Sequence, residues 1–323
     1  MKVLITREIC LKIDMNRIFL AAQVLTVFLF LSSCNSLFPE SEEHLQDTIQ
    51  TIYASVEERP GTRNAIDNET FKVSWTAGDA INVFFGTASS SCFVTEESGS
   101  VAKFKGSIDV ITGGGEGLND ETSLWGIYPY NAANSCDGAN VTLTLPAVQQ
   151  PAENTFAPGI WPTVACSKNF YMSFYNVCGA FRFTVYHDNI KKVTLSGNSD
   201  EELAGRAKVS FVTEPLVEEI SFGEKIITMS APDGECFKPG VNYYLVVYPT
   251  AFSNGMTLTF YTEDSYASYV YSKSYTLNRS SSIRFKEWDK DLTFTSSSSE
   301  GWGDGGAVDD HQVVVVVDGY ECY

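Results

Sequence analysis

Short segments rich in β-branched and aromatic residues follow one another from residue 71 to residue 288, and this succession limits the fold more than any other feature of the sequence. Clusters of Gly, Asn, Asp and Ser separate the segments at intervals of about ten residues. After residue 35 no stretch shows the 3.6-residue apolar period of an amphipathic helix. The pattern predicts a mostly β protein, and many short strands at this spacing favour sandwiches. The expected strands are residues 71–75, 80–85, 101–106, 124–130, 141–145, 171–177, 179–187, 191–195, 205–211, 225–230, 242–249, 256–262, 268–277 and 282–288.

The two halves of the chain contain a similar pair of segments. In the first half a strand-like segment ends at Tyr-Pro (128–129), and a polar loop leads to the Thr-rich segment 141–145. In the second half the same order recurs at 248–249 and 256–260. A separation on the order of a hundred residues is too long for a solenoid repeat and fits duplicated domains. We therefore expect two tandem β-sandwiches, with chance similarity of short β-motifs as the alternative. The expected sandwiches comprise residues 64–177 and 178–295.

The N-terminus has the three parts of a secretory signal. A basic start precedes the apolar run 18–31, and small residues lead to Cys34. The run is too short to span a bilayer comfortably, and a buried core helix is the alternative. The ending Leu-Ser-Ser-Cys resembles the bacterial lipobox, in which the cysteine is acylated. We therefore expect residues 1–34 to be a lipoprotein signal peptide, with Met15 as its better start, and Cys34 to carry the lipid anchor.

Polar stretches flank the expected strands on both sides. Residues 35–63 begin as an acidic tether and contain a strand-like run at 49–56. Residues 296–323 begin as a Ser- and Gly-rich linker and then carry consecutive valines. A strand that is apolar on both faces needs burial on both sides, in its own sheet or in a neighbouring molecule. The valines are Val313, Val314, Val315, Val316 and Val317.

The charge and the scarce chemistry-bearing residues exclude several classes of function. A formal net charge of -18 repels phosphate backbones, so nucleic acid is not expected as a partner. The three histidines are far apart, and the cysteines form no C-x-x-C pair, so we expect no metal site. The glycine-rich segment 112–117 lacks the Gly-Lys-Ser/Thr of a phosphate-binding loop. With no nucleophile motif either, the sequence predicts no enzymatic activity and no cofactor.

Two kinds of residue remain as candidates for contact with other molecules. Arg63 precedes Asn64 in a polar, turn-rich stretch that a protease could reach, and an exposed arginine without a special role is the alternative. Trp161 and Trp302 lie in loop-like contexts, where exposed indole rings suit stacking on sugars. Packing in a core is the alternative for such tryptophans.

Several segments also carry a resemblance to a known family. They are the lipobox, a short strand followed by Thr-Arg, the motif W-x-x-G-D-x-I (75–81), the segment "LWGIYPYNA" and the segment "GAFRF" (179–183). Together they resemble the fimbrillin-like proteins of Bacteroidales, the type V pilins, over roughly residues 48–295. The resemblance implies two tandem transthyretin-like antiparallel β-sandwich domains. It also implies export as a lipoprotein of the cell outer membrane and assembly into surface fimbriae by β-strand exchange.

In the scheme that the resemblance implies, an arginine-specific protease cleaves after Arg63 and removes a strand that lies within 47–56. A strand of another fimbrial subunit, of the same or a different kind, then fills the open groove by β-augmentation. The valine run 313–317 is the candidate donor strand, and an ordinary final strand of its own sheet is the alternative. The Gly-rich spacer before it departs from the family pattern, so stalk, tip and anchor roles all stay open.

The sequence thus predicts a structural or adhesive subunit of surface fimbriae that is exposed on the outer membrane. Its partners would be other fimbrial subunits and a host or bacterial surface ligand. The alternative is a stand-alone surface lipoprotein that binds glycans through Trp161 and Trp302.

Overall fold

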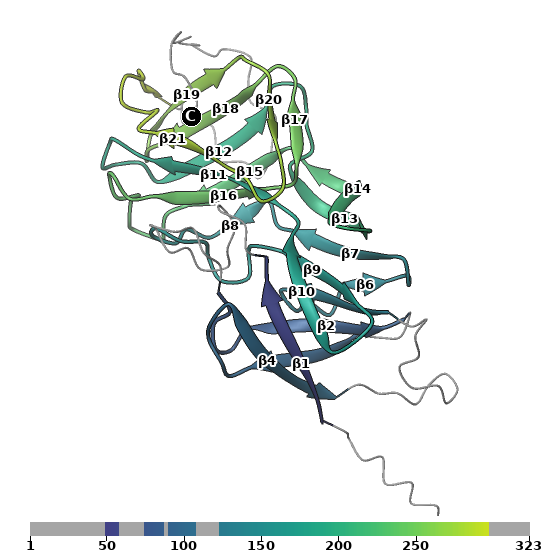
Figure 1. Ribbon diagram of the computed structural model, residues 1–323. Coiled ribbons are helices and arrows are strands. Elements are labelled where there is room, and N and C mark those ends of the chain that lie inside the picture. Colours follow the sequence, from purple (N-terminus) through teal and green to yellow (C-terminus); the bar gives the residue numbers. More distant parts are fainter. Residues whose placement is uncertain (1–48, 58–73, 87–89, 108–122, 297–323) are drawn as a thin grey trace, which may run out of the picture. The chain divides into compact units, whose positions relative to one another are not determined.

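The computed structural model describes residues 49–57, 74–86, 90–107 and 123–296 (Figure 1). Within these ranges the secondary structure consists of strands, bridges and turns, which confirms the prediction of a mostly β protein. None of the described residues belongs to a helix long and apolar enough to cross a membrane.

Seven strands close a barrel, and Figure 1 shows several of them around the first strand. Neighbouring strands in the barrel are antiparallel, with one exception. The first and the last barrel strand in chain order are neighbours that run parallel. Their inward side chains alternate with outward ones, as the pleat of a strand requires. In order around the barrel the strands are β1 (Ile49–Val56), β10 (Tyr171–Asn176), β9 (Thr163–Ser167), β5 (Leu124–Tyr128), β2 (Ala80–Phe85), β3 (Ser91–Thr95) and β4 (Val101–Ser107).

Trp75 lies in the core of the barrel and is fully buried. Its ring meets the edges or faces of three aromatic side chains, with centroid distances of 4.9 Å to Phe104, 5.5 Å to Tyr128 and 5.2 Å to Phe174. Such edge-to-face contacts stabilise an aromatic cluster beyond the area that they bury. The barrel therefore has its own apolar core, to which β1 contributes Ile52.

A second core is covered in part by a small sheet whose strands come from distant parts of the chain. In order the sheet contains β16 (Tyr243–Val247), β11 (Gly179–Thr184) and β21 (Ser282–Lys286). Its central strand β11 runs antiparallel to β16 and parallel to β21. Every residue of β16 is buried, so apolar residues occupy both of its faces. A separate two-stranded sheet pairs β17 (Thr250–Phe252) with β20 (Tyr275–Leu277).

A six-stranded sheet and a four-stranded sheet complete the described strands. Alternating buried residues, clearest in β18 (Met256–Tyr261), face the second core. The six-stranded sheet has the order β22 (Thr295–Ser296), β19 (Ser265–Tyr271), β18, β12 (Lys192–Gly197), β15 (Ile226–Ser230) and β8 (Val148–Gln149). The four-stranded sheet has the order β14 (Pro215–Glu224), β13 (Ala204–Phe211), β7 (Asn140–Leu145) and β6 (Ser135–Cys136).

The sheets divide the chain differently from the two expected domains, 64–177 and 178–295. Strands β6, β7 and β8 precede β9 in the sequence, yet β7 pairs with β13 and β8 lies parallel to β15. The reason is that the buried side chains of β7 pack in the second core and not in the barrel. The barrel in turn includes β1, which precedes residue 64 and therefore lies outside the expected range 64–177. The transthyretin-like character of the two parts stays a prediction.

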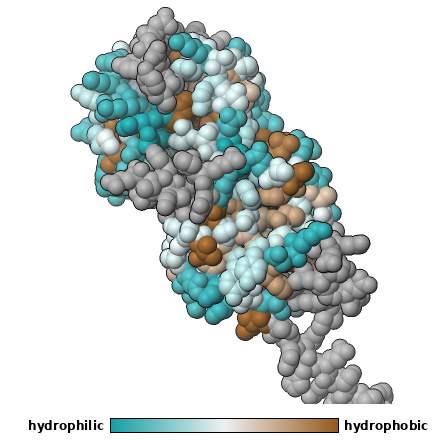
Figure 2. Space-filling model, in the orientation of Figure 1, coloured by the Kyte–Doolittle hydropathy of each residue, from teal (hydrophilic) through white to brown (hydrophobic). Residues whose placement is uncertain are grey.

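Apolar residues on the visible face appear at several separate points among hydrophilic ones (Figure 2). Large exposed side chains include Ile49 and Tyr171 of the barrel and Phe222 of the edge strand β14, which is 90% exposed. Single exposed apolar residues are common on protein surfaces.

Replacing Trp75 by alanine should destabilise the protein, because the ring is buried among three aromatic side chains. We expect Trp75→Ala to lower the free energy of unfolding by about 3–5 kcal/mol, as for other buried aromatic residues. Urea unfolding followed by circular dichroism measures this, with Phe222→Ala as the matched control because that ring is exposed. Equal losses for the two variants would contradict the assignment of Trp75 to the core.

Candidate functional site

Strand β1 occupies the place between β4 and β10 and closes the barrel. It pairs antiparallel with β4 over seven residue pairs, from Ile49 opposite Ser107 to Ser55 opposite Val101. On its other edge it pairs parallel with β10 over four residue pairs. Without β1 the backbone groups of both neighbours would face an open gap, which is a ready template for another strand.

The inward side chains of β1 belong to the barrel core. Ile52 and Ala54 are completely buried, and Val56 is nearly so. The carbonyl of Ala54 also accepts a hydrogen bond from Trp75 Nε1 at 3.0 Å. Removing β1 would therefore expose apolar core and take away the acceptor of a buried indole N–H, which costs free energy.

The outward side chains of β1 make cross-strand contacts with β10. The rings of Tyr53 and Tyr171 stack with centroids 4.9 Å apart and planes 16° apart. The hydroxyl oxygens of Ser55 and Ser173 lie 3.2 Å from each other. Contacts of this kind stabilise a strand pair modestly and add to the pairing of the backbone.

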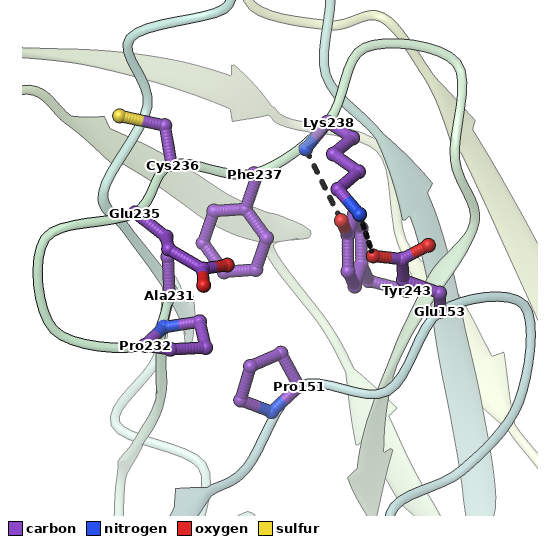
Figure 3. A pocket seen from close by; sticks show the side chains of 9 residues that line it. All are labelled: Pro151, Glu153, Ala231, Pro232, Glu235, Cys236, Phe237, Lys238 and Tyr243. Atoms are coloured by element: carbon purple, nitrogen blue, oxygen red, sulfur yellow. Dashed lines mark hydrogen bonds and ion pairs between the residues drawn. The ribbon is translucent and has the colours of Figure 1, made fainter.

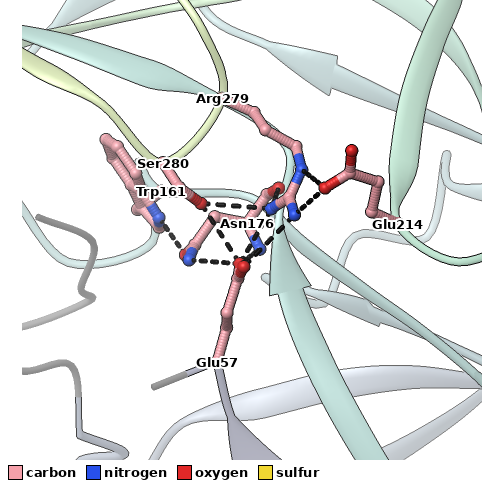
Figure 4. A network of polar contacts seen from close by, with 6 residues as sticks. All are labelled: Glu57, Trp161, Asn176, Glu214, Arg279 and Ser280. Carbon is pink, nitrogen blue, oxygen red and sulfur yellow. Dashed lines mark hydrogen bonds and ion pairs between the residues drawn. The ribbon is translucent and has the colours of Figure 1, made fainter. Parts of the chain in front are cut away.

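A buried cluster of polar side chains lies where β1 ends (Figure 4). Glu57 follows β1 directly, and its carboxylate accepts two hydrogen bonds from the guanidinium of Arg279, from Nη1 to Oε2 at 2.8 Å and from Nη2 to Oε1 at 3.2 Å. The same Oε2 accepts hydrogen bonds from Ser280 Oγ at 3.1 Å and from Asn176 Nδ2 at 3.2 Å. Glu214 is the second carboxylate on Arg279, which donates to it from Nε at 3.0 Å and from Nη2. We call Glu57, Asn176, Arg279 and Ser280 the carboxylate clamp.

The local backbone aims the donors of the clamp at Glu57. Arg279 and Ser280 lie in the turn between β20 and β21. Ser280 has φ of 58°, a left-handed conformation that is uncommon for a residue other than glycine. Its N–H donates to the carbonyl of Cys178 at 2.8 Å, which fixes the turn on the start of the second core. Strain of this kind persists only where neighbouring contacts determine it, and it clusters at functional sites.

The ion pair of the clamp keeps Arg279 charged. Burial by itself lowers the pKa of the Arg279 guanidinium, but hydrogen bonds to Glu57 and Glu214 outweigh it and raise the pKa above its usual value. Side-chain exposure is 4% for Glu57 and 10% for Arg279, so the pair is shielded from water. Breaking such a pair by removing one partner leaves an uncompensated buried charge.

The W-x-x-G-D-x-I motif positions the barrel core and not a reactive group. Gly78 has φ of 97°, which a side chain would disfavour, and this allows the turn before Asp79. The Asp79 carboxylate accepts hydrogen bonds from the N–H of Thr76 at 2.8 Å and from the hydroxyl of Tyr128 at 3.1 Å. Burial raises the pKa of Asp79, although both hydrogen bonds oppose the shift. Through these two hydrogen bonds Asp79 fixes the turn that follows Trp75 and connects it to Tyr128, whose ring packs against Trp75.

Trp161 is buried, so the expectation of an exposed ring that contacts glycans is wrong for this residue. Only 1% of its surface is exposed, and its ring lies 4.4 Å from the ring of Phe156. Its indole N–H donates to Oδ1 of Asn176, a member of the clamp (Figure 4). The proline-rich loop before β9 folds this side chain inward because the core offers both an aromatic neighbour and a hydrogen-bond acceptor.

The other predicted site residues lie outside the described part of the chain. They remain predictions in their several roles of lipid attachment, cleavage, glycan contact and strand donation. They are Cys34, Arg63, Asn64, Trp302, Val313, Val314, Val315, Val316 and Val317.

Among the described residues no group of His, Cys, Asp and Glu has the arrangement of a metal site. A small surface pocket lies between the loop after β8 and the loop after β15 (Figure 3). Its lining includes Pro151, Pro232, Phe237 and Glu235, and two further charged residues that line it, Glu153 and Lys238, form an ion pair with each other. This pairing leaves the pocket without a feature that points to a ligand. The five described cysteines are free thiols.

Among known proteins, the chain is similar to several solved structures. No protein-family model matches it, and no curated protein does. Among solved structures, it is similar to a putative cell adhesion protein from Bacteroides ovatus, with 17% identity and a TM-score of 0.46 over 79% of this chain and 98% of that one. A putative cell adhesion protein from Bacteroides uniformis gives 16% identity and a TM-score of 0.44 over 78% and 97%. The tip fimbrial protein Mfa3 from Porphyromonas gingivalis, with a C-terminal truncation, gives 10% and 0.34 over 77% and 99%. These are proteins of the kind that the sequence resemblance named.

Removing Arg279 should weaken the attachment of β1 more than an ordinary surface substitution does. We expect Arg279→Ala to lower the free energy of unfolding by about 3–5 kcal/mol, because Glu57 would stay buried without its counter-ion. Glu57→Gln combined with Arg279→Ala should recover part of the loss, since no buried charge is then left unpaired. Urea unfolding measures all three proteins, and Arg206→Ala, at an exposed arginine of β13, is the control. A loss below about 1 kcal/mol for Arg279→Ala would show that the pair does not hold β1.

Proposed function

We propose that this chain is an adhesive or structural subunit of surface fimbriae and that β1 is the strand which assembly replaces. The observation that carries the proposal is the position of β1 in the chain. It is the one described barrel strand that precedes Arg63, and the next begins at Ala80. A single cleavage after Arg63 would therefore separate a whole barrel strand from the rest of the protein.

The loss of β1 would create an acceptor groove of a kind that binds strands. The groove would have the unpaired edges of β4 and β10 as its sides and the core around Trp75 as its floor. A strand from another subunit satisfies the free backbone groups and covers the apolar floor at the same time. The binding energy comes from main-chain pairing, and the inward side chains provide selectivity.

The route to the surface is part of the same proposal. Lipidation at Cys34 would anchor the exported protein in the outer membrane, since each buried methylene contributes about 0.8 kcal/mol. Cleavage after Arg63 would then release the body from its lipid and its first strand together. The surface ligand and the place of the subunit in the fimbria stay open, and the proposed role involves no catalysis.

The alternative of a stand-alone glycan-binding lipoprotein has lost one of its two candidate residues. Trp161 is buried and engaged with Asn176, so its ring has no free face for a sugar. Trp302 lies outside the described residues, and no described feature favours this alternative.

Sequencing the N-terminus of the mature surface protein tests the proposal directly. We expect a start at Asn64 in the material that migrates as a polymer ladder on unboiled gels. Arg63→Ala should retain a lipid-blocked Cys34 and abolish the ladder, because β1 stays covalently attached. Arg59→Ala is the matched control, since a bond before Pro60 is a poor site for such proteases and its loss should change nothing. Ladder bands whose N-terminus lies before residue 64 would overturn the proposal.

A further inference from the structure

We infer that the donors of the carboxylate clamp, Asn176, Arg279 and Ser280, select the strand that replaces β1, and that they select one with an acidic residue directly after its last inward aliphatic side chain. The segment 313–318 of a second copy of this chain fits that requirement, with Asp318 in the place of Glu57. The inference rests on the proposed function, with the valine run already expected as the candidate donor, and adds to it the residues that set the register of that strand.

The inward positions of β1 define only part of what the site requires. Positions 52, 54 and 56 face the core, while 53 and 55 face outward. Shifting a strand by two residues keeps its inward and outward faces and its backbone pairing, since both repeat every two residues. Apolar packing alone therefore cannot fix the register of a uniformly apolar strand.

The clamp removes this ambiguity because it lies at one fixed point. Arg279, Ser280 and Asn176 all donate hydrogen bonds to one carboxylate oxygen of Glu57, and they come from two separate parts of the chain. If the replacing strand has no carboxylate at this point, the guanidinium of Arg279 and the donors of Ser280 and Asn176 lose the acceptor that they share. Glu214 also contacts Arg279, but its side chain is 53% exposed, and the bonds that it receives from Arg279 come from Nε and Nη2, not from Nη1. It cannot replace the acceptor that Nη1, Ser280 and Asn176 share.

The end of the chain carries the matching pattern. Aligning Asp318 with Glu57 places Val317 at the position of Val56 and Val313 at the position of Ile52. Val315 then takes the inward position of Ala54, and the other two valines face outward. A run of five valines has no register of its own, and the acid that ends it supplies one.

The tail is long enough to reach another molecule. The last described residue is Ser296, and residues 297–312 separate it from the valine run. A segment of this length spans at most roughly 55 Å when extended. The net charge of -18 would make two copies repel each other, so a buried cation that accepts an acidic strand end is a local complement to the tail.

A synthetic peptide of residues 307–323 tests the inference by competition. Added to the full-length protein while it is processed and polymerises, the peptide should occupy the acceptor groove and shorten the ladder on unboiled gels. We expect an Asp318→Asn peptide to need at least about tenfold higher concentration for the same effect, because it removes one partner of a buried charge pair. An Asp318→Glu peptide should regain most of the activity of the natural sequence. The matched control is Asp309→Asn, which changes an acid of the same tail outside the clamp position.

The outcomes separate the inference from the function on which it rests. Absence of a ladder from the natural protein would overturn the proposed function itself. A ladder that persists when residues 307–323 are deleted would keep the function and exclude the tail as the donor. Equal inhibition by the natural and the Asp318→Asn peptides would keep the tail as donor and exclude the clamp as its selector. The last two results each overturn the inference.

Discussion

The ion pair between Glu57 and Arg279 joins the first strand of the barrel to a turn 222 residues later in the sequence. It fixes the point where β1 ends, since the carboxylate that follows the strand accepts hydrogen bonds from Arg279, Ser280 and Asn176 there. It also connects the barrel with the second core, because Arg279 and Ser280 belong to the turn between β20 and β21. The closure of the barrel and the position of this turn are thus coupled through one buried carboxylate.

Three layers of interaction hold β1, and they differ in how specific they are. Backbone pairing with β4 and β10 accepts any extended chain. The core around Trp75 accepts any strand with aliphatic side chains at alternate positions. The clamp alone requires a particular chemical group at a particular position. In the proposed strand exchange, a strand of different sequence would replace β1 if it kept the alternation and ended in an acid.

Much of the fold could be predicted from the local sequence. Where the prediction failed, there is a physical reason. The expected strand 80–85 coincides with β2, and 256–262 nearly coincides with β18, because both have dense β-branched and aromatic residues. Strand β14 (Pro215–Glu224) was not expected, since its glutamates and mostly unburied side chains lack an apolar face. Strand β14 lies at the edge of its sheet, where it pairs with β13, and at this position it does not require an apolar face. Strands β7 and β13 pair although they are far apart in the sequence, and no local sequence pattern predicts such a pairing.

Less of the candidate site than of the fold could be predicted from the sequence. The proposed role of β1 as a removable strand could be predicted from the family resemblance and from the position of Arg63. The clamp does not, because Arg279 and Ser280 lie in a polar turn of ordinary composition, "NRSS", and Glu57 precedes another glutamate in the sequence. Only their meeting in space gives them a function. Trp161 illustrates the converse, since a tryptophan in a proline-rich loop looks exposed until the loop folds over a core.

A disulfide between β1 and β10 tests most directly whether β1 must leave the barrel. Ser55 and Ser173 are paired across the two strands with hydroxyl oxygens 3.2 Å apart, so we expect cysteines at these two positions to form a disulfide. The double variant Ser55→Cys with Ser173→Cys should form no polymer ladder when oxidised and a normal ladder after reduction, while each single variant polymerises in both states. A full ladder from the oxidised double variant, with its disulfide verified by mass spectrometry, would contradict the account.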